Sequence, residues 1–222
     1  MIKIVKLISG LFFFSVLPLA GYGFFDITGY VSNTQRALYL AITIVNTLFS
    51  VFFVAFEGQQ LKSHKTLIHE NPMWFLQFQL LPFLNIIIAP LFDSMNVCPL
   101  PGGDSLRWAG IAVAVLSFAL INLSVMSLGK FFTINLTIQE GHRLIQTGLY
   151  RYVRHPRYTG VILMSLSLAL VFASAIGLLF TLAILINLIV RIRREEKMLA
   201  AEFGAEWADY HSRTKALIPF IY

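Results

Sequence analysis

The longest uncharged segment of the chain, Gly160 to Val190, contains 31 residues. As a single helix it would be about 46 Å long, whereas the hydrocarbon core of a bilayer is about 30 Å thick. Small residues gather near its middle, at positions 173–177. The segment is therefore predicted to fold back on itself as a tight helical hairpin, with helices over Arg157–Ala173 and Gly177–Arg194.

Four other apolar stretches, each with few or no charges, have the length of a membrane span. They are Leu7–Phe25, Ala37–Phe56, Trp74–Phe92 and Trp108–Gly129. The composition agrees, because 57% of the residues are hydrophobic and only 13% are charged, compared with about 25% charged in soluble domains. Together with the hairpin, these stretches predict an all-α integral membrane protein with about six membrane-embedded helices.

The loops between these spans alternate between basic and non-basic. The N-terminus, the loop with Lys62 and Lys65, the segment after Gly129 and the C-terminal tail carry most of the Lys and Arg residues. By the positive-inside rule, this alternation places both termini in the cytoplasm. Lys3 and the apolar run after it have some features of a signal peptide, but we interpret them as an uncleaved first span.

Charge is unevenly distributed along the chain. Residues 130–222 hold 11 Lys and Arg against 6 Asp and Glu, and so carry +5 of the net charge of +6. We therefore divide the chain into residues 1–129, four transmembrane helices that form a scaffold, and residues 130–222, which contain the hairpin 157–194. The basic residues flank lipid-length spans, which argues against a nucleic-acid partner.

The segment 142–160 has the first set of residues suited to chemistry. Gly148 permits a turn with positive φ. Pro156 suits the first turn of a helix and places His155 at the start of the hairpin. The free N–H groups of a helix start bind a carboxylate or a ribose hydroxyl well. Alternatively, Arg151, Arg154 and Arg157 form an anchor for lipid phosphate, and the tyrosines belong to an aromatic belt.

The second set, residues 191–198, follows the uncharged run directly and includes Arg191, Glu195 and Glu196. One interpretation is a solvated helix end, on which Arg191 and Glu195 pair at i,i+4. However, ionisable residues near membrane depth tend to be functional. Because both ends of a hairpin face the same side, Glu195 is predicted to lie beside His155 and Tyr158.

Other sites are not indicated. There is no phosphate loop, dinucleotide fingerprint or nucleophile elbow. The histidines and the single cysteine, Cys98, do not have the spacing of metal ligands, so no metal site is predicted.

Together, these motifs resemble the isoprenylcysteine carboxyl methyltransferase family, which is related to membrane phospholipid and thiol methyltransferases. The resemblance covers about residues 130–222. It rests on Gly148-Leu149-Tyr150, Arg154-His155-Pro156-x-Tyr158-x-Gly160, Glu195-Glu196, Phe203-Gly204 and Tyr210.

The resemblance implies a cytoplasmic region that binds S-adenosyl-L-methionine, and methyl transfer to a lipophilic, membrane-embedded acceptor. It implies a substrate-holding, catalytic role for Arg191, and a possible acceptor cavity within residues 1–129. The cofactor-binding residues that it implies are His142, Arg143, Leu144, Ile145, Tyr150, His155, Pro156, Arg157, Tyr158 and Glu195.

Several alternatives stay open from the sequence alone. The first expectation for the acceptor is the carboxylate of an isoprenylcysteine, which would be O-methylated; a small thiol and a phospholipid amine are the others. A non-enzymatic membrane transport or scaffold protein is the competing class. The compact length favours a bacterial cytoplasmic membrane, with the endoplasmic reticulum membrane as the alternative.

Overall fold

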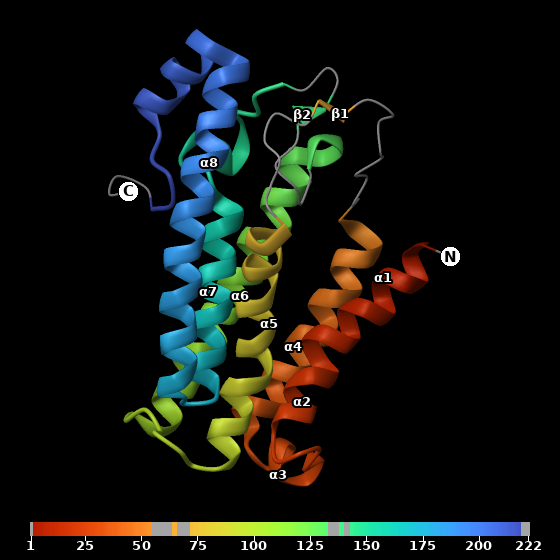
Figure 1. The fold of residues 1–222 in the computed structure, drawn as a ribbon. Helices are drawn as coiled ribbons and strands as arrows, with labels where there is room; N and C mark the ends of the chain where they lie inside the picture. The colour runs from red at the N-terminus through yellow and green to blue at the C-terminus, as the bar shows by residue number, and fades with distance from the viewer. Residues whose placement is uncertain (1, 55–63, 66–71, 133–137, 140–142, 219–222) are drawn as a thin grey trace.

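The chain forms a bundle of helices that run up and down in turn, and the described residues begin and end toward the same end of the bundle (Figure 1). The computed structural model describes residues 2–54, 64–65, 72–132, 138–139 and 143–218. Within this part, four helices are long and apolar enough to cross a membrane, and the apolar helical segments 80–94 and 156–171 are shorter. The predicted all-α membrane fold is confirmed.

The N-terminal passes are tilted away from the rest of the bundle (Figure 1). The first pass begins near the N-terminus and is almost continuously helical, because a π-helical turn connects its two α-helices without a break. It ends four residues before the predicted boundary at Phe25, and a short helix precedes the second pass. These elements are α1 (Ile2–Leu11), η1 (Phe12–Val16), α2 (Leu17–Gly21), α3 (Ile27–Ser32) and α4 (Thr34–Phe53).

The middle of the chain supplies the next two passes. A two-residue antiparallel pairing, with His64 opposite Gln139 and Lys65 opposite Ile138, lies at the same end as the termini. These elements are β1 (His64–Lys65), α5 (Pro72–Ser94), α6 (Gly103–Leu128), η2 (Gly129–Phe131) and β2 (Ile138–Gln139).

The predicted hairpin is present, and its three-residue turn, 172–174, lies two residues earlier than predicted. The 3₁₀ turn η3 (Gly148–Arg151) precedes helices α7 (Pro156–Val171) and α8 (Ala175–Arg213). Ala173 has a φ of 42° in the turn. The Ser174 side chain then accepts a hydrogen bond of 3.1 Å from the Gly177 amide, so it caps the start of α8.

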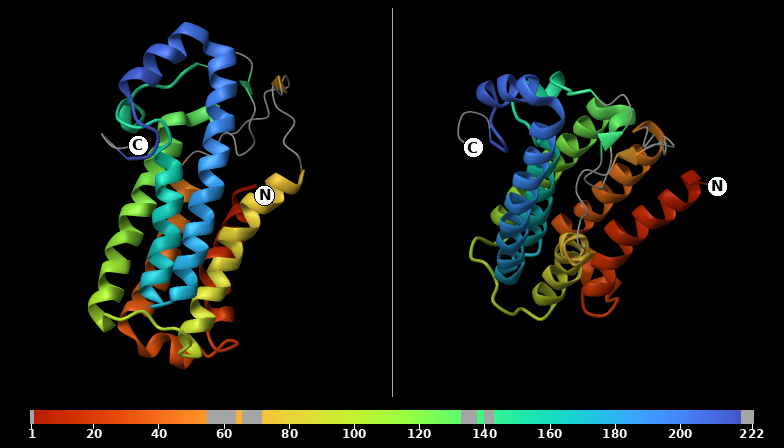
Figure 2. Two further views of the ribbon diagram at one scale, coloured as in Figure 1. Left: turned by 60° about the vertical axis from the view of Figure 1, so that its left-hand side comes forward. Right: turned by 45° about the horizontal axis from the view of Figure 1, so that its top comes forward.

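Helix α8 continues 19 residues beyond the predicted boundary at Arg194. The prediction ended the helix where charges begin, but residues 194–202 are mostly strong helix formers and need no lipid to stay helical. At Gly204, φ is 49° and the helix changes direction. As a result, its last part turns back over the end of the bundle (Figure 2).

Close packing joins α6 to the hairpin. A Cβ atom on Gly160 of α7 would lie 2.6 Å from the Ile121 side chain and 3.2 Å from the Ser117 carbonyl oxygen of α6. The Ser117 hydroxyl also donates to the Gly160 carbonyl at 3.0 Å. Small residues of this kind let membrane helices approach closely, and here they fix the position of α7.

Three polar side chains inside the bundle are paired with one another. Asn85 of α5 donates to the Ser165 hydroxyl of α7 at 2.7 Å, and Ser165 lies 2.9 Å from the Thr181 hydroxyl of α8. Because unpaired polar groups are costly away from water, this chain of contacts holds α5 against both helices of the hairpin.

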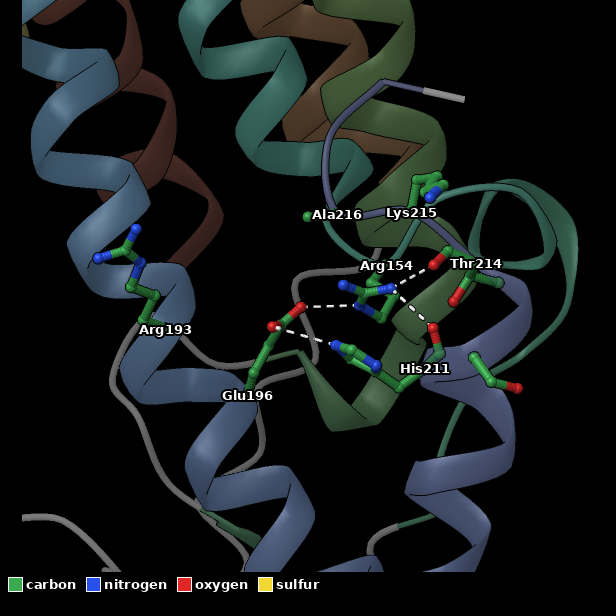
Figure 3. Close-up of a pocket in the computed structure, with 8 residues that line it drawn as sticks. Arg154, Arg193, Glu196, His211, Thr214, Lys215 and Ala216 are labelled. Atoms are coloured by element: carbon green, nitrogen blue, oxygen red, sulfur yellow. Dashed lines mark hydrogen bonds and ion pairs between the residues drawn. The ribbon is translucent and has the colours of Figure 1, made fainter. Parts of the chain in front are cut away.

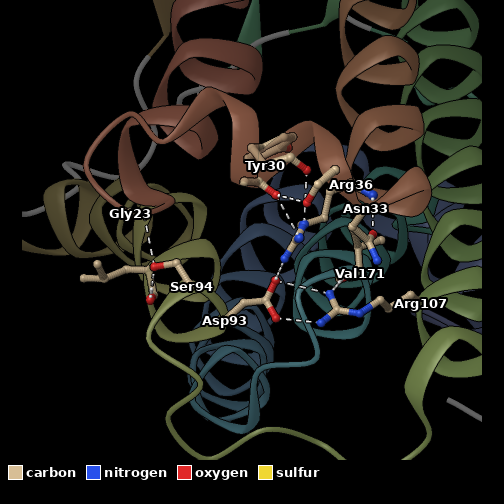
Figure 4. Close-up of polar contacts among 11 residues, drawn as sticks. Gly23, Tyr30, Asn33, Arg36, Asp93, Ser94, Arg107 and Val171 are labelled. Carbon is tan, nitrogen blue, oxygen red and sulfur yellow. Dashed lines mark hydrogen bonds and ion pairs between the residues drawn. The ribbon is translucent and has the colours of Figure 1, made fainter.

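A largely buried ionic cluster, drawn in Figure 4, ties the helices together at the end of the bundle where α5 ends and α6 begins (Figure 1). The Asp93 carboxylate of α5 accepts from Arg36 of α4 at 2.9 Å and from Arg107 of α6 at 2.6 Å. Arg107 also donates to the Val171 carbonyl at the end of α7. Each of these three charged residues lies one position outside a predicted span, whereas the structure places all of them within the helices, near their ends.

Candidate functional site

The segment before α7 is held in place by the C-terminal tail. The His155 amide donates to the Ala216 carbonyl at 2.9 Å, and the Arg154 amide donates to the Lys215 carbonyl at 2.8 Å. Pro156 is buried and is the first residue of α7, so His155 is the N-cap residue, as the sequence predicted. The tail therefore fixes the backbone on which His155 is presented.

Tyr158 connects the two halves of the hairpin. Its hydroxyl donates to Glu195 Oε2 at 2.6 Å and accepts from Arg191 Nε at 3.0 Å. Tyr158 and Arg191 are buried, whereas a quarter of the Glu195 side chain is exposed. The hairpin thus brings together residues about 35 positions apart, and it leaves one carboxylate accessible to a ligand.

His155 lies between two carboxylates. Its Nδ1 atom is 3.9 Å from Glu195 Oε1, and its Nε2 atom is 3.2 Å from Glu196 Oε1. The imidazole ring also stacks on the Tyr158 ring, with centroids 5.5 Å apart. These contacts set the orientation of the ring, because a stacked imidazole with a partner at each nitrogen has little freedom to rotate.

Glu196 and Arg154 form a supporting pair that the sequence analysis did not assign to the site. Arg154 Nε donates to Glu196 Oε1 at 2.7 Å, and Nη1 donates to the carbonyls of His211 and Thr214. Arg154 therefore links α8 to the tail that positions His155. Both residues belong to the motifs Arg154-His155-Pro156 and Glu195-Glu196, and this is the sequence signal that could have indicated the pair.

Tyr150 and Arg157 lie close to the same cluster. Burial raises the pKa of the Tyr150 phenol well above its ordinary value, and the Glu195 charge raises this pKa further while Arg157 lowers it. The Arg157 guanidinium lies over the Phe132 ring, 4.9 Å from its centroid. Tyr150 is therefore a neutral, buried donor or acceptor close to the Glu195 carboxylate.

The turn before this segment has the predicted geometry. Gly148 has a φ of 61°, and a Cβ atom there would lie 3.1 Å from the Ser127 hydroxyl of α6. The Tyr210 hydroxyl, from the end of α8, donates to the Tyr150 carbonyl at 2.7 Å. The turn is thus held between α6 and the returning part of α8.

The remaining predicted residues are less closely connected to the cluster. His142 lies outside the described residues. Arg143 is exposed, and Leu144 and Ile145 are half-buried, on the segment that leads to η3. This segment is tied to the last part of α8 through Gln146, which bonds to Glu206 and Arg213. In the described part of the chain, Arg143, Leu144 and Ile145 are not among the hydrogen-bonded residues around Glu195.

The arrangement offers acceptors and donors for a polar ligand at the end of an apolar bundle. Glu195 supplies carboxylate oxygens, Arg191 supplies a guanidinium, and Tyr150 and Tyr158 supply phenols. Among the described residues there is no group of His, Cys, Asp and Glu that could hold a metal ion. The fold and site define a multi-pass helical membrane protein with a polar ligand site formed at one end of a helical hairpin.

Comparisons with known proteins agree with this class. The model of the isoprenylcysteine carboxyl methyltransferase family matches residues 110–201, which include α7, the turn and most of α8. A protein named protein-S-isoprenylcysteine O-methyltransferase B, from Arabidopsis thaliana, is 25% identical over 203 residues, which cover 89% of this chain and 98% of that protein. The chain belongs to the isoprenylcysteine carboxyl methyltransferase family, and family membership implies a methyl donor.

Two further comparisons extend the likeness. YpbQ, an uncharacterised protein of Bacillus subtilis, is 31% identical over 128 residues, which cover 57% of this chain and 72% of that protein. A solved structure of the eukaryotic intramembrane Ras methyltransferase ICMT superposes with a TM-score of 0.57 at 20% identity, covering 99% of this chain and 74% of that one. The likeness to this solved structure concerns the fold alone.

Proposed function

We propose that this chain is an integral-membrane methyltransferase that uses S-adenosyl-L-methionine and methylates the carboxylate of an isoprenylcysteine-like acceptor. The observation that carries the proposal is the convergence of His155, Tyr158, Arg191 and Glu195 at one end of the hairpin. The names of several relatives, which are protein-S-isoprenylcysteine O-methyltransferases, support the choice of acceptor.

The residues at the site fit this cofactor by their chemistry. S-adenosyl-L-methionine carries ribose hydroxyls and an amino group, which need acceptors, and the partly exposed Glu195 carboxylate supplies them. When bound, the cofactor supplies a methyl group on a positively charged sulfur. We infer that Glu195, Tyr158, His155 and Tyr150 would hold it, with Pro156 and Arg157 at the same helix start.

The segment before η3 completes the proposed cofactor site. We assign it the residues His142, Arg143, Leu144 and Ile145, which precede the Gly148 turn. Gln146 anchors this segment to α8, which is the helix that carries Glu195.

Arg191 is proposed to hold the acceptor. A carboxylate is already ionised at neutral pH and needs no base, so transfer depends on alignment rather than on proton removal. The terminal nitrogens of Arg191 would hold the carboxylate bidentately. Tyr158 accepts from Nε and so orients the guanidinium. Arg191 would thus keep the acceptor carboxylate aligned with the methyl group that a bound cofactor would supply.

The apolar part of the molecule suits a lipophilic acceptor. Residues 1–129 supply long apolar helices, and we propose that they form a scaffold with a cavity through which the acceptor chain enters from the bilayer. We also propose that both termini lie in the cytoplasm, because the basic residues of the described segments 143–157 and 191–215 lie at the end of the bundle that holds the site. A bacterial cytoplasmic membrane is the proposed location, and the endoplasmic reticulum membrane is the alternative.

The test is a labelled-methyl transfer assay on the purified chain with three acceptors: a prenylated cysteine with a free carboxylate, a small thiol and phosphatidylethanolamine. We expect label on the prenylated cysteine, released by mild base, because an ester is base-labile whereas a thioether and a methylamine are not. Base-stable label on the thiol or on phosphatidylethanolamine would contradict the proposed carboxylate acceptor and assign the enzyme to that other acceptor class. No transfer at all, together with no cofactor binding, would favour a transport or scaffold protein.

A further inference from the structure

A pocket lies beside Glu196, whose Oε1 atom is 3.2 Å from His155 Nε2. It has a volume of about 500 Å³ and lies between α8 and the tail (Figure 3). Arg193 and Glu196 line it from α8, and His211 and Lys215 line it from the returning end of the chain. None of its lining residues is among those proposed above to bind the cofactor or the acceptor.

The charge of this pocket is positive. Its one carboxylate, Glu196, is already paired with Arg154 at 2.7 Å and lies 3.7 Å from His211 Nε2. Arg193 and Lys215 are exposed, and they stand on opposite sides of the pocket in Figure 3. Once the Glu196–Arg154 pair is set aside, these two side chains give the pocket a net charge of about +2, so it favours an anion.

The depth of the pocket relative to the membrane indicates which anion it binds. Arg193 comes three residues after the end of the uncharged run at Val190, where a helix leaves the hydrocarbon core. Beside Lys215 the tail becomes apolar again, with Leu217 buried and Ile218 48% exposed. The pocket is therefore at the depth of lipid headgroups, where the common anion is phosphate. Arg binds phosphate through its planar fork, and Lys binds it as a point charge.

We propose that this pocket is a binding site for a phosphate group, which is supplied by the headgroup of an anionic phospholipid. The phosphate lies between Arg193 and Lys215. Because Lys215 is on the tail whose carbonyls accept from Arg154 and His155, a bound phosphate also holds this tail against α8. Binding is therefore expected to stabilise the folded chain, independently of any methyl transfer.

The experiment is a thermal-unfolding titration of the full-length chain in detergent micelles, with phosphatidylglycerol, phosphatidylcholine or inorganic phosphate as the probe. We expect phosphatidylglycerol to raise the unfolding midpoint by about 3–6 °C at ten times its Kd, and phosphatidylcholine to have a smaller effect. Arg193→Gln combined with Lys215→Gln should raise the Kd for phosphatidylglycerol by about 10-fold or more. The matched control, Arg151→Gln with Lys197→Gln, removes the same charge from exposed positions that do not line the pocket.

The same titration distinguishes the two sources of phosphate, which are a lipid headgroup and free inorganic phosphate. An equal midpoint shift with inorganic phosphate, lost in the pocket variant and kept in the control, would assign the pocket to free phosphate and overturn the lipid assignment. Equal phosphatidylglycerol shifts in both double variants would overturn the site itself. Native mass spectrometry of bound lipid on the same variants is the second measurement, should either variant unfold early.

Discussion

Tyr158 is the residue on which the candidate site depends most. Its hydroxyl joins two charged side chains of α8, Arg191 and Glu195, to α7. Its ring also stacks on His155. The phenyl ring therefore contributes packing and the hydroxyl contributes orientation, and a substitution that removes only the hydroxyl separates these two contributions.

We expect Tyr158→Phe to fold normally and to lose about 10- to 100-fold in kcat/KM for methyl transfer, because hydrogen bonds to charged groups contribute about 1.5–3 kcal/mol. The measurement is a steady-state methyl transfer assay with the prenylated acceptor. Tyr152→Phe is the matched control, since Tyr152 is 59% exposed. Equal kinetics in Tyr158→Phe and the wild type would show that the hydroxyl does not orient the site.

Sequence patterns at the scale of the residue predicted part of this arrangement. Pro156 and Gly148 have conformational requirements that are visible in any sequence, and both have the expected geometry. The role of Glu196 was missed, because an acidic pair on a helix does not reveal which carboxylate faces which neighbour. That choice depends on the direction in which the tail returns, and the turn at Gly204 sets that direction.

Among the elements, the hairpin was predictable because its cause is local: an uncharged run too long for one span must turn. The cluster of Arg36, Asp93 and Arg107 was not predictable from local sequence. These residues come from three helices and meet only when the bundle is assembled, and each lies one residue outside a predicted span. Hydropathy places such residues at a membrane surface but does not indicate that they pair with one another.

We expect Asp93→Asn to destabilise the bundle strongly. It leaves two buried guanidinium groups without their carboxylate, and breaking a buried ion pair in this way costs about 3 kcal/mol or more. The unfolding midpoint should fall by about 6–12 °C for a chain of this size. The control is Asp104→Asn, which removes the same charge from an exposed position in the first turn of α6. Equal midpoints for the two variants would contradict a structural role for the cluster.

The whole molecule is organised as a bundle with two unlike ends. The end with the termini holds His155, Glu195 and the basic residues of the C-terminal region, whereas the other end holds the Asp93 cluster. The sequence predicted this polarity from the alternation of loop charges. The tilt of the first passes away from the others follows from helix packing, which loop charges do not specify (Figure 1).

The proposed orientation can be tested with a membrane-impermeant maleimide on intact cells. Cys98 is the single cysteine and is exposed in the loop between α5 and α6, at the end opposite the termini. We expect it to react in intact cells. In a Cys98→Ser background, Ala208→Cys near the end of α8 should react only after permeabilisation. The reverse pattern would invert the proposed topology without changing the fold.

The central claim is that the hairpin makes one cofactor site from His155 and Glu195, and calorimetric titration with S-adenosylhomocysteine tests it most directly. We predict that the wild-type chain and an exposed control, Glu202→Ala, bind with similar Kd, whereas His155→Ala and Glu195→Ala each raise the Kd by about 10-fold or more. Wild-type affinity in both of the last two variants, each folded as judged by size-exclusion chromatography, would contradict the claim.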